Sequence, residues 1–451
     1  MDAIKFAPSD GLSYNPNEEK YWDKNALRKE IDRTFEICHS CRMCFKFCDA
    51  FPAIFNIIDD EDTKIKDFSE NQLSHIADLC FQCKICYFKC PYTKDDEHEF
   101  DLDFPRLIQR YKTIQAKEKG IPLRDKLLGN PDFLGKVGCG TSAVANIANK
   151  FSVNRFFMEK TIGIHHKKKL PPFAGETFYS WFEKNKADYS LSEAEIEDKV
   201  VLFHTCFGNY NNPDIAKDAV FVLWKNGIDV AVPKMNCCGM PALESGNLDM
   251  AVQEADSNYK NLAPFVEKGY KILVLNPTCS LTMKDDYPIL LEKKYSKEDL
   301  ENFSKAVFDT NEYLFMLKRE DKFNRNFKTT PGKVAYHIPC HLRAQNIGYR
   351  SRDMMRTISD TSFVLVDECC GHNGTWAMKK ENFEDSMRIG SKAFNKIKEN
   401  EHDIVATDCP LAAIQLEQGT GEEVLHTIQV LARAYREDGF EKQISPTEEE
   451  N

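Results

Sequence analysis

Two cysteine-rich stretches dominate the first quarter of the chain: "CHSCRMCFKFCDAF" at residues 38–51 and "CFQCKICYFKCPYT" at residues 80–93. In each stretch, four cysteines follow one another at intervals of three, three and four residues. A C-x-x-C-x-x-C run lets one tight loop present three thiolates to a single iron–sulfur cube, and a fourth thiolate comes from elsewhere. Zinc sites more often use two separated C-x-x-C pairs. The spacing therefore predicts two 4Fe–4S clusters.

The ligand sets follow from a ferredoxin precedent. In bacterial ferredoxins with two clusters, the fourth cysteine of each run binds the other cluster. This precedent assigns Cys38, Cys41, Cys44 and Cys90 to one cluster, and Cys80, Cys83, Cys86 and Cys48 to the second. One departure is that Pro91 follows Cys90, as in ferredoxins, whereas Asp49 follows Cys48. We expect Asp49 to cap a short helix that begins near Pro52.

Helices are predicted directly before both runs. Apolar residues recur at steps of four from Leu27 to Phe35 and lead to Cys38, which predicts a helix with Cys38 on its buried face. Ser69 and Gln72 have the spacing of a capping box before the second run.

Composition restricts the class of protein. The 451-residue chain contains 17 cysteines, an odd number, and its first ten residues lack the apolar run of a secretory signal. Clustered thiols without such a signal indicate a metal protein in a reducing compartment. The sequence contains no run of about 18 apolar residues, which is the length that predicts a membrane-spanning helix. The net charge of −11 argues against general nucleic-acid binding. We expect a soluble, cytoplasmic metal protein that binds no nucleic acid.

From residue 199 onward, a second pattern occurs twice. Each copy contains three short apolar runs, and each run leads into cysteine. The first copy reads "KVVLFHTC" (199–206), "IDVAVPKMNCCG" (228–239) and "YKILVLNPTC" (270–279). The second reads "KVAYHIPC" (333–340), "SFVLVDECCG" (362–371) and "DIVATDC" (403–409). Apolar runs that alternate with amphipathic segments predict strand–helix–strand units and one parallel sheet per copy.

The cysteines of both copies lie just beyond predicted strand ends, where open parallel sheets place their ligand sites. The candidate metal ligands are Cys206, Cys237, Cys238 and Cys279 in the first copy, and Cys340, Cys369, Cys370 and Cys409 in the second. Four thiols suit either an iron–sulfur cluster or a tetrahedral zinc ion, and both remain open for each copy. Nearby histidines at 204, 337, 341 and 372 are additional candidates, although a single histidine is more often structural.

The segments "NCCGMP" (236–241) and "ECCGHNG" (368–374), each flanked by the other strand-end cysteines, resemble the cysteine-rich CCG domain. That domain occurs in pairs in a subunit of heterodisulfide reductase and in iron–sulfur subunits of glycolate oxidase. Together with the two ferredoxin-type runs, the layout over about residues 30–420 is similar to the family of iron–sulfur subunits that includes one from anaerobic glycerol-3-phosphate dehydrogenase. The resemblance implies an electron-transfer subunit of an oxidoreductase. Such a subunit accepts electrons from a flavoprotein dehydrogenase, of the glycerol-3-phosphate or 2-hydroxy-acid type, and passes them to a quinone or other acceptor.

The closing segments depart from heterodisulfide reductase. There each copy ends in a C-x-x-C pair, whereas "NPTCSLT" (276–282) and "TDCPLAA" (407–413) contain one cysteine each, with Thr282 and Ala412 in the position of the last. Disulfide reduction at these sites is therefore the alternative function, and a zinc-held binding module is a weaker one. No G-x-G-x-x-G follows a predicted strand, so we expect any flavin or nicotinamide on a partner subunit.

The expected fold is a multidomain α+β arrangement. A helical ferredoxin-like domain with two clusters (1–135) is followed by a helical connector (136–198), two α/β CCG repeats (199–330 and 331–440) and a disordered tail (441–451). In the connector, Val144, Ile147 and Phe151 share a helical face, and a basic run follows at 165–169. A helix on a membrane surface has this pattern, and so does a connector packed on the domain. We favour the packed connector with a solvated basic run, and keep peripheral contact with the inner face of a membrane as the alternative.

Overall fold

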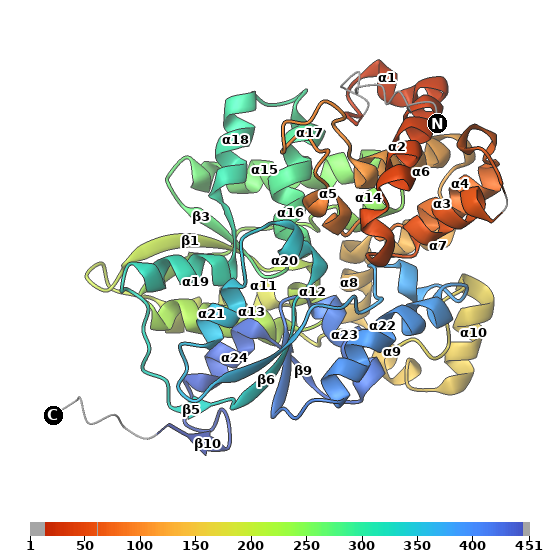
Figure 1. Cartoon of the computed structure of the whole chain (residues 1–451). Coiled ribbons are helices and arrows are strands. Elements are labelled where there is room, and N and C mark those ends of the chain that lie inside the picture. The colour runs from red at the N-terminus through yellow and green to blue at the C-terminus, as the bar shows by residue number, and fades with distance from the viewer. Residues whose placement is uncertain (1–13, 61, 445–451) are drawn as a thin grey trace.

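The computed structural model describes residues 14–60 and 62–444 (Figure 1). The first ten residues, where a secretory signal would lie, and positions 445–451 of the predicted tail are outside the described residues. Lys442 and Gln443 form strand β10 and pair antiparallel with β5 (Thr329–Thr330). The prediction of a disordered tail is therefore wrong for these two residues, because backbone hydrogen bonds hold them against the second repeat.

The N-terminal part is helical, as expected. Its helices are α1 (Glu19–Trp22), α2 (Lys24–Cys41), α3 (Ala50–Asp59), α4 (Glu70–Leu79), α5 (Ile85–Lys89) and α6 (Phe104–Lys119). Helix α2 buries Leu27 and Phe35 and delivers Cys38 in its last turns. Helix α4 begins with the predicted capping box of Ser69 and Gln72. Both helix predictions are confirmed.

The predicted role of Asp49 is wrong. Asp49 precedes α3, but its side chain makes no capping hydrogen bond. Its backbone is already helical (φ −72°, ψ −14°), whereas a capping side chain normally requires an extended residue. The carboxylate instead accepts a hydrogen bond from Arg388, which lies in the second CCG repeat.

The connector consists of short helices. They are α7 (Leu123–Leu128), α8 (Pro131–Gly140), α9 (Ser142–Ala148), α10 (Ser152–Ile162) and α11 (Phe178–Asn185). The predicted boundary between residues 135 and 136 falls inside α8. Val144, Ile147 and Phe151 are 72%, 56% and 59% exposed, so the expectation that this face packs on the domain is wrong. Within the described ranges, no helix is long and apolar enough to cross a membrane.

Each CCG repeat contains one four-stranded parallel sheet. The first consists of β1 (Asp198–Phe203), β2 (Ile228–Ala231), β3 (Lys271–Val274) and β4 (Val307–Asp309), and the second of β6 (Lys333–His337), β7 (Ser362–Val366), β8 (Ile404–Thr407) and β9 (Val424–His426). The strand orders are β2-β1-β3-β4 and β7-β6-β8-β9, so the sheets have equivalent topologies. Six of these strands were predicted. The three-residue edge strands β4 and β9 were missed because they are too short to show a periodicity.

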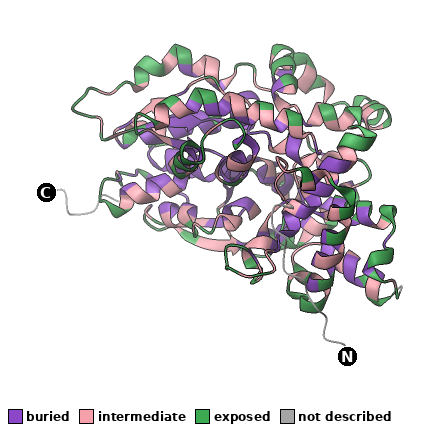
Figure 2. Cartoon of the chain, turned by 90° about the horizontal axis from the view of Figure 1, so that it is seen from above, coloured by how far each residue is buried: buried purple, intermediate pink, exposed green. Residues whose placement is uncertain are grey.

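Helices cover both sheets. Those of the first repeat are α12 (Thr205–Tyr210), α13 (Pro213–Lys225), α14 (Met240–Glu244), α15 (Leu248–Val266), α16 (Pro277–Leu281), α17 (Tyr287–Leu291), α18 (Lys297–Ala306) and α19 (Thr310–Arg319). Those of the second are α20 (Cys340–Ala344), α21 (Arg350–Met355), α22 (Phe383–Lys398), α23 (Pro410–Thr420) and α24 (Thr427–Ala434). As Figure 2 shows, the buried residues are concentrated in the interior elements, while the outer helices present exposed faces.

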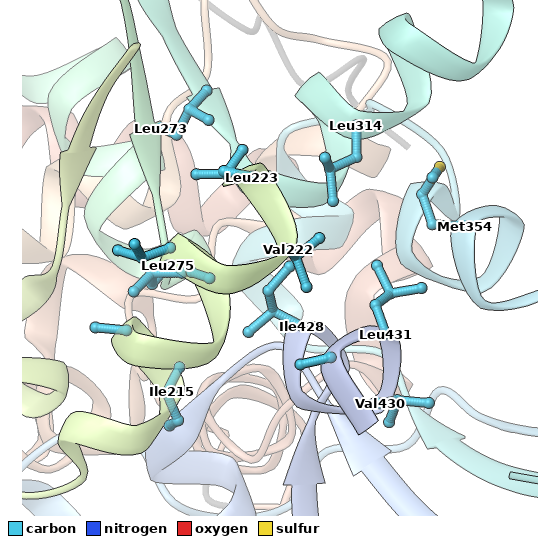
Figure 3. Close-up of a cluster of buried hydrophobic side chains, with 14 of the residues drawn as sticks. Ile215, Val222, Leu223, Leu273, Leu275, Leu314, Met354, Ile428, Val430 and Leu431 are labelled. Atoms are coloured by element: carbon cyan, nitrogen blue, oxygen red, sulfur yellow. The ribbon is translucent and has the colours of Figure 1, made fainter. Parts of the chain in front are cut away.

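The two repeats share one hydrophobic core. Figure 3 shows Val222 and Leu223 of α13 near Ile428 and Leu431 of α24, with Leu314 of α19 close by. All five side chains are fully buried. The two repeats are therefore joined by helices that pack against each other, such as α13 against α24.

This shared core predicts cooperative unfolding. Replacing Leu431 by Ala should lower the free energy of unfolding by about 2–5 kcal/mol, because a buried leucine loses its contacts and leaves a cavity. Both repeats should unfold in the same transition during chemical denaturation of the metal-loaded protein. The control Val144→Ala, at an exposed position, should change stability by less than about 0.5 kcal/mol. Two separate transitions for the repeats would contradict the shared core.

Candidate metal centres

The eight N-terminal thiols fall into two groups. Burial raises the pKa of Cys38 well above its usual value, and Cys44, Cys90 and Cys41 raise it further. Burial likewise raises the pKa of Cys48, and its thiol neighbours are Cys83 and Cys80. Thus Cys90 of the second run lies with the first run, and Cys48 lies with the second. This is the crossed arrangement that the ferredoxin spacing predicts.

The two runs reach this geometry with the same backbone device. Arg42 follows the second cysteine of the first run and has φ 53°, and Lys84 occupies the equivalent place in the second run with φ 57°. Left-handed backbone is uncommon for residues other than glycine, and it persists where the surrounding structure enforces it. In both runs this residue lies between the second and third thiols, at a helix boundary.

In the first CCG repeat, the four candidate thiols converge. Hydrogen bonds with Cys206 and Cys238, followed by burial, raise the pKa of Cys237. Cys238 interacts with the thiols of both Cys237 and Cys279, and these contacts lower its pKa well below the usual value. Although Cys206 and Cys279 are far apart in the sequence, β1 and β3 are adjacent and parallel, so their carboxyl ends bring both residues to one edge of the sheet.

Polar side chains fix the loop that carries the first cysteine pair. The Cys237 backbone N–H donates to Asp132 Oδ2 of α8 at 2.6 Å. Asn258 Nδ2 donates to the Cys237 carbonyl at 2.9 Å, and the Tyr287 hydroxyl donates to the Cys238 carbonyl at 3.2 Å. None of these residues was singled out from the sequence, because no local pattern distinguishes them from ordinary buried polar residues.

The second repeat assembles its thiols in the same way. Burial raises the pKa of Cys340, whose thiol neighbours are Cys83, Cys369, Cys370 and Cys409. Cys340 begins α20, the cysteine pair follows β7, and Cys409 immediately precedes α23. Cys83 belongs to the ferredoxin-type part, so that part directly adjoins the second repeat.

A histidine connects three of the thiol groups. His341 lies next to Cys340, and its Nε2–H donates to the Gln82 carbonyl at 2.9 Å. Its Nδ1 lies 2.8 Å from the hydroxyl of Thr278, the residue before Cys279. Burial lowers the pKa of His341, so the ring is neutral and acts as a hydrogen-bonding connector.

The other candidate histidines are buried and uncharged. Burial lowers the pKa of His204 and of His337 to about 4, and each ring has hydrogen-bonding partners close to its own sheet. Burial lowers the pKa of His372 to about 3, and no described residue offers either ring nitrogen a well-aligned hydrogen bond. His426 was not among the candidates predicted from the sequence. Its Nε2 lies 2.9 Å from both the Leu275 and Asp408 carbonyls and thereby links the two repeats.

Thr282 and Ala412 occupy the positions of the missing closing cysteines, and neither provides a metal-binding thiol. Thr282 is buried, and its hydroxyl donates to the Thr278 carbonyl at 2.8 Å. Ala412 is 3% exposed within α23. Cys139, the remaining cysteine of the chain, lies outside all four groups, with its Sγ 3.3 Å from the Tyr210 carbonyl. Each group therefore contains four thiols.

A smaller cluster lies in the connector. Glu159, His165 and His166 place one potential ligand atom each within 4.8 Å of one another. However, Glu159 Oε2 already accepts a hydrogen bond from the His166 backbone at 2.7 Å and lies 2.6 Å from its ring Nδ1. These contacts explain the cluster without a metal, because they connect α10 to the loop that follows it.

The donor set fits iron–sulfur clusters. Most of these thiols have raised pKa values, first because burial disfavours the thiolate and then because neighbouring thiolates repel one another, and a metal centre relieves both effects when protons leave. The four groups also form a continuous series. Cys44 interacts with Cys83, Cys83 with Cys340, and Cys279 with Cys409.

Comparison with known proteins agrees with this geometry. Residues 31–118 match the Fer4-like domain of citrate utilization protein B, and residues 200–284 and 334–417 match the cysteine-rich CCG domain. One subunit of the anaerobic glycerol-3-phosphate dehydrogenase of Escherichia coli is 30% identical over 343 residues, which cover 74% of this chain and 82% of that protein. The chain belongs to the family of this subunit. The predicted resemblance, fold class and iron–sulfur character are thereby confirmed.

Two further proteins are similar to about half of this chain. One subunit of the fumarate reductase (CoM/CoB) of Methanothermobacter marburgensis is 29% identical over 53% of this chain and 47% of that protein. Lactate utilization protein A of Bacillus pumilus is 25% identical over 47% of this chain and 87% of that protein. The homologues of this chain are thus iron–sulfur subunits of oxidoreductases.

The crossed thiol groups predict which variants share a phenotype. Cys38→Ser and Cys90→Ser should abolish the same EPR signal of the reduced protein, because both thiols belong to one group. Cys48→Ser should abolish a different signal together with Cys80→Ser. The control Cys139→Ser should leave every signal intact. If Cys90→Ser instead affected the same signal as Cys80→Ser, the crossed assignment would be wrong.

Proposed function

We propose that this protein is the electron-transfer subunit of an oxidoreductase complex. It receives electrons from a flavoprotein dehydrogenase subunit and passes them to a quinone or another acceptor. The observation that carries the proposal is the continuous series of four thiol groups, each next to another. Iron–sulfur clusters bound in these groups would supply one-electron redox chemistry. The chain itself contributes thiolate ligands, a low-dielectric surround and fixed relative positions.

We propose two 4Fe–4S clusters in the N-terminal groups, and an iron–sulfur cluster in at least one CCG repeat. Support for the second part comes from the adjacent cysteines 237–238 and 369–370. Tight tetrahedral zinc sites prefer residues between their paired thiols, whereas a multi-iron cluster accommodates an adjacent pair at separate corners.

A partner subunit would supply the flavin. Neither a dinucleotide fingerprint nor a phosphate-binding loop occurs in the sequence. Three relatives carry the names of a glycerol-3-phosphate dehydrogenase subunit, a fumarate reductase subunit and a lactate utilization protein. These names support a donor that oxidises glycerol 3-phosphate or a 2-hydroxy acid.

The partner assignment predicts a specific dependence. The purified chain should not transfer electrons from glycerol 3-phosphate, lactate or glycolate to an artificial dye. Addition of the cognate flavoprotein subunit with its substrate should bleach the cluster absorbance of this chain. Oxidation of substrate by the flavin-free chain alone would contradict the subunit assignment.

We also propose that the connector rests on an anionic lipid surface. Large apolar side chains are exposed along α7 to α10: Leu123, Phe133, Val137, Val144, Ile147, Phe151, Val153, Phe156 and Phe157. We call these nine residues the apolar face. Exposed apolar patches mark interaction sites.

Charge favours lipid as the occupant of the apolar face. Between residues 121 and 170 there are nine lysines and arginines but only three acidic residues, although the whole chain has a net charge of −11. Basic residues still outnumber acidic ones when the buried Arg155 and Lys168 are left out. Apolar side chains surrounded by basic ones suit the boundary between acyl chains and anionic headgroups.

Vesicle binding tests the apolar face. The triple variant Val144→Ser, Ile147→Ser and Phe157→Ser should weaken co-sedimentation with phosphatidylglycerol-containing vesicles by about tenfold or more, because each side chain loses apolar burial. The control Tyr349→Ser, at an exposed aromatic residue on the second repeat, should bind like the wild type. Equal vesicle binding by the triple variant and wild type would reject the lipid contact.

A further inference from the structure

One lysine of the basic run is buried. Lys167 and Lys169 are exposed, as expected for a solvated run, but Lys168 is only 2% exposed. The expectation of a fully solvated run is therefore wrong at this position. Lys169 pairs with Glu417 at the surface, whereas the side chain of Lys168 enters the interior of the second repeat.

A chain of hydrogen bonds connects the Lys168 ammonium to the loop that carries the Cys369–Cys370 pair. Its Nζ donates to Gln415 Oε1. Gln415 Nε2 donates to Ser386 Oγ at 3.0 Å, and Ser386 Oγ donates to the Gly371 carbonyl at 2.7 Å. Gly371 directly follows the Cys369–Cys370 pair.

Gln415 also connects the lysine to the fourth thiol. It lies on α23, and Cys409 is the residue that caps the start of this helix. Lys168 is thus tied to the elements that position three of the four second-repeat thiols, although it comes from the connector and not from the repeat.

The buried lysine has no carboxylate partner. Among residues 14–60 and 62–444, no aspartate or glutamate forms an ion pair with Lys168. An isolated ammonium is costly to bury, and it persists where an anionic group balances it. Burial lowers the pKa of Lys168 to about 8, and Cys370 opposes this shift. The neighbouring His372 is neutral, so it neither balances nor adds to the charge.

One other charged residue near the second-repeat thiols is buried: Asp408 precedes Cys409, and its carboxylate accepts hydrogen bonds from Tyr336 and Thr427. The remaining charged groups lie toward solvent. Arg343 donates to the Asp367 carbonyl, and Lys396 pairs with Asp367 and Glu368. Asp49 pairs with Arg388. Charges that are exposed to water and to salt act weakly, whereas a charge inside the protein is screened much less.

Among the described residues, no buried lysine accompanies the thiols of the first repeat. There the Cys237 backbone donates to a carboxylate, that of Asp132. Burial, together with Asp132 and Cys238, raises the pKa of Glu254 to about 7. Both repeats therefore have a carboxylate near their thiols, and the described residues place a buried ammonium beside the second alone.

We infer that Lys168 is the buried counter-cation of the metal group held by Cys340, Cys369, Cys370 and Cys409, and that it raises the reduction potential of that group. Reduction adds one negative charge, which a nearby cation stabilises. Net charge around a cluster is among the factors that set its potential. Lys168 contributes no ligand atom to the group. Its positive charge acts on the group electrostatically. This inference rests on the proposed function, since it requires a redox-active cluster in the second repeat.

A redox titration of the whole metal-loaded protein, followed by EPR, tests the inference. The second-repeat signal is identified as the one that Cys370→Ser abolishes. Lys168→Gln removes the charge but retains a donor to Gln415, and Lys168→Met removes both. Both variants should shift the midpoint potential of this signal downward by a similar amount and leave the other signals at their wild-type potentials. The matched control Lys169→Gln should shift none.

Three outcomes would overturn the inference. An unchanged midpoint in Lys168→Gln would show that the charge has no effect, even if Lys168→Met shifts it, because the shift would then come from the lost hydrogen bond. A Lys169→Gln shift as large as that of Lys168→Gln would show a general surface-charge effect. If iron analysis finds that Cys370→Ser removes neither iron nor a signal, the second repeat holds no cluster, and the proposed function fails there together with the inference. In the first two cases the protein still contains the iron of the second repeat. The Lys168 inference then fails while the proposed function stands.

Discussion

The cost of ionising buried thiols that lie close together is the constraint on which this structure depends. Burial and neighbouring cysteines raise the pKa of Cys38, Cys86 and Cys340 well above the usual value for a thiol. Such groups cannot ionise together in a low-dielectric interior unless a cationic centre compensates them. Metal binding and correct packing of the surrounding loops are therefore coupled, because the favourable energy of ligation is available only when all four thiols of a group converge.

Neutral histidines and a shared core hold the four groups in fixed relation. His341 joins the second ferredoxin-type run to both CCG repeats, and His426 joins the two repeats to each other. Burial keeps the His341 ring uncharged, so the connection has no cost of a buried imidazolium. The common core of α13 and α24 adds rigidity between the sheets. Such rigidity suits electron transfer, which needs fixed separations between redox groups and no movement of the chain.

The connector contributes more than a link between domains. Asp132 of α8 supports the first cysteine pair, and Lys168 enters the second repeat. The duplicated repeats have equivalent topologies. The connector nevertheless places a carboxylate next to the first thiol group and an ammonium near the second. A duplicated fold can in this way give two equivalent sets of thiols unequal electrostatic surroundings. Meanwhile, α7 to α10 expose an apolar face on the same connector.

Local patterns were sufficient to predict the main elements and the cysteines that come together, because both depend on neighbours in the sequence. The intervals between Cys38 and Cys48 predict a cluster-binding run, the spacing from Leu27 to Phe35 predicts a helix, and strand-end cysteines predict a ligand edge. The roles of Asp49 and Lys168 depended instead on residues more than 200 positions away, Arg388 and Gln415. No periodicity or motif encodes such pairs, since long-range packing alone decides whether a charged side chain faces water or the interior.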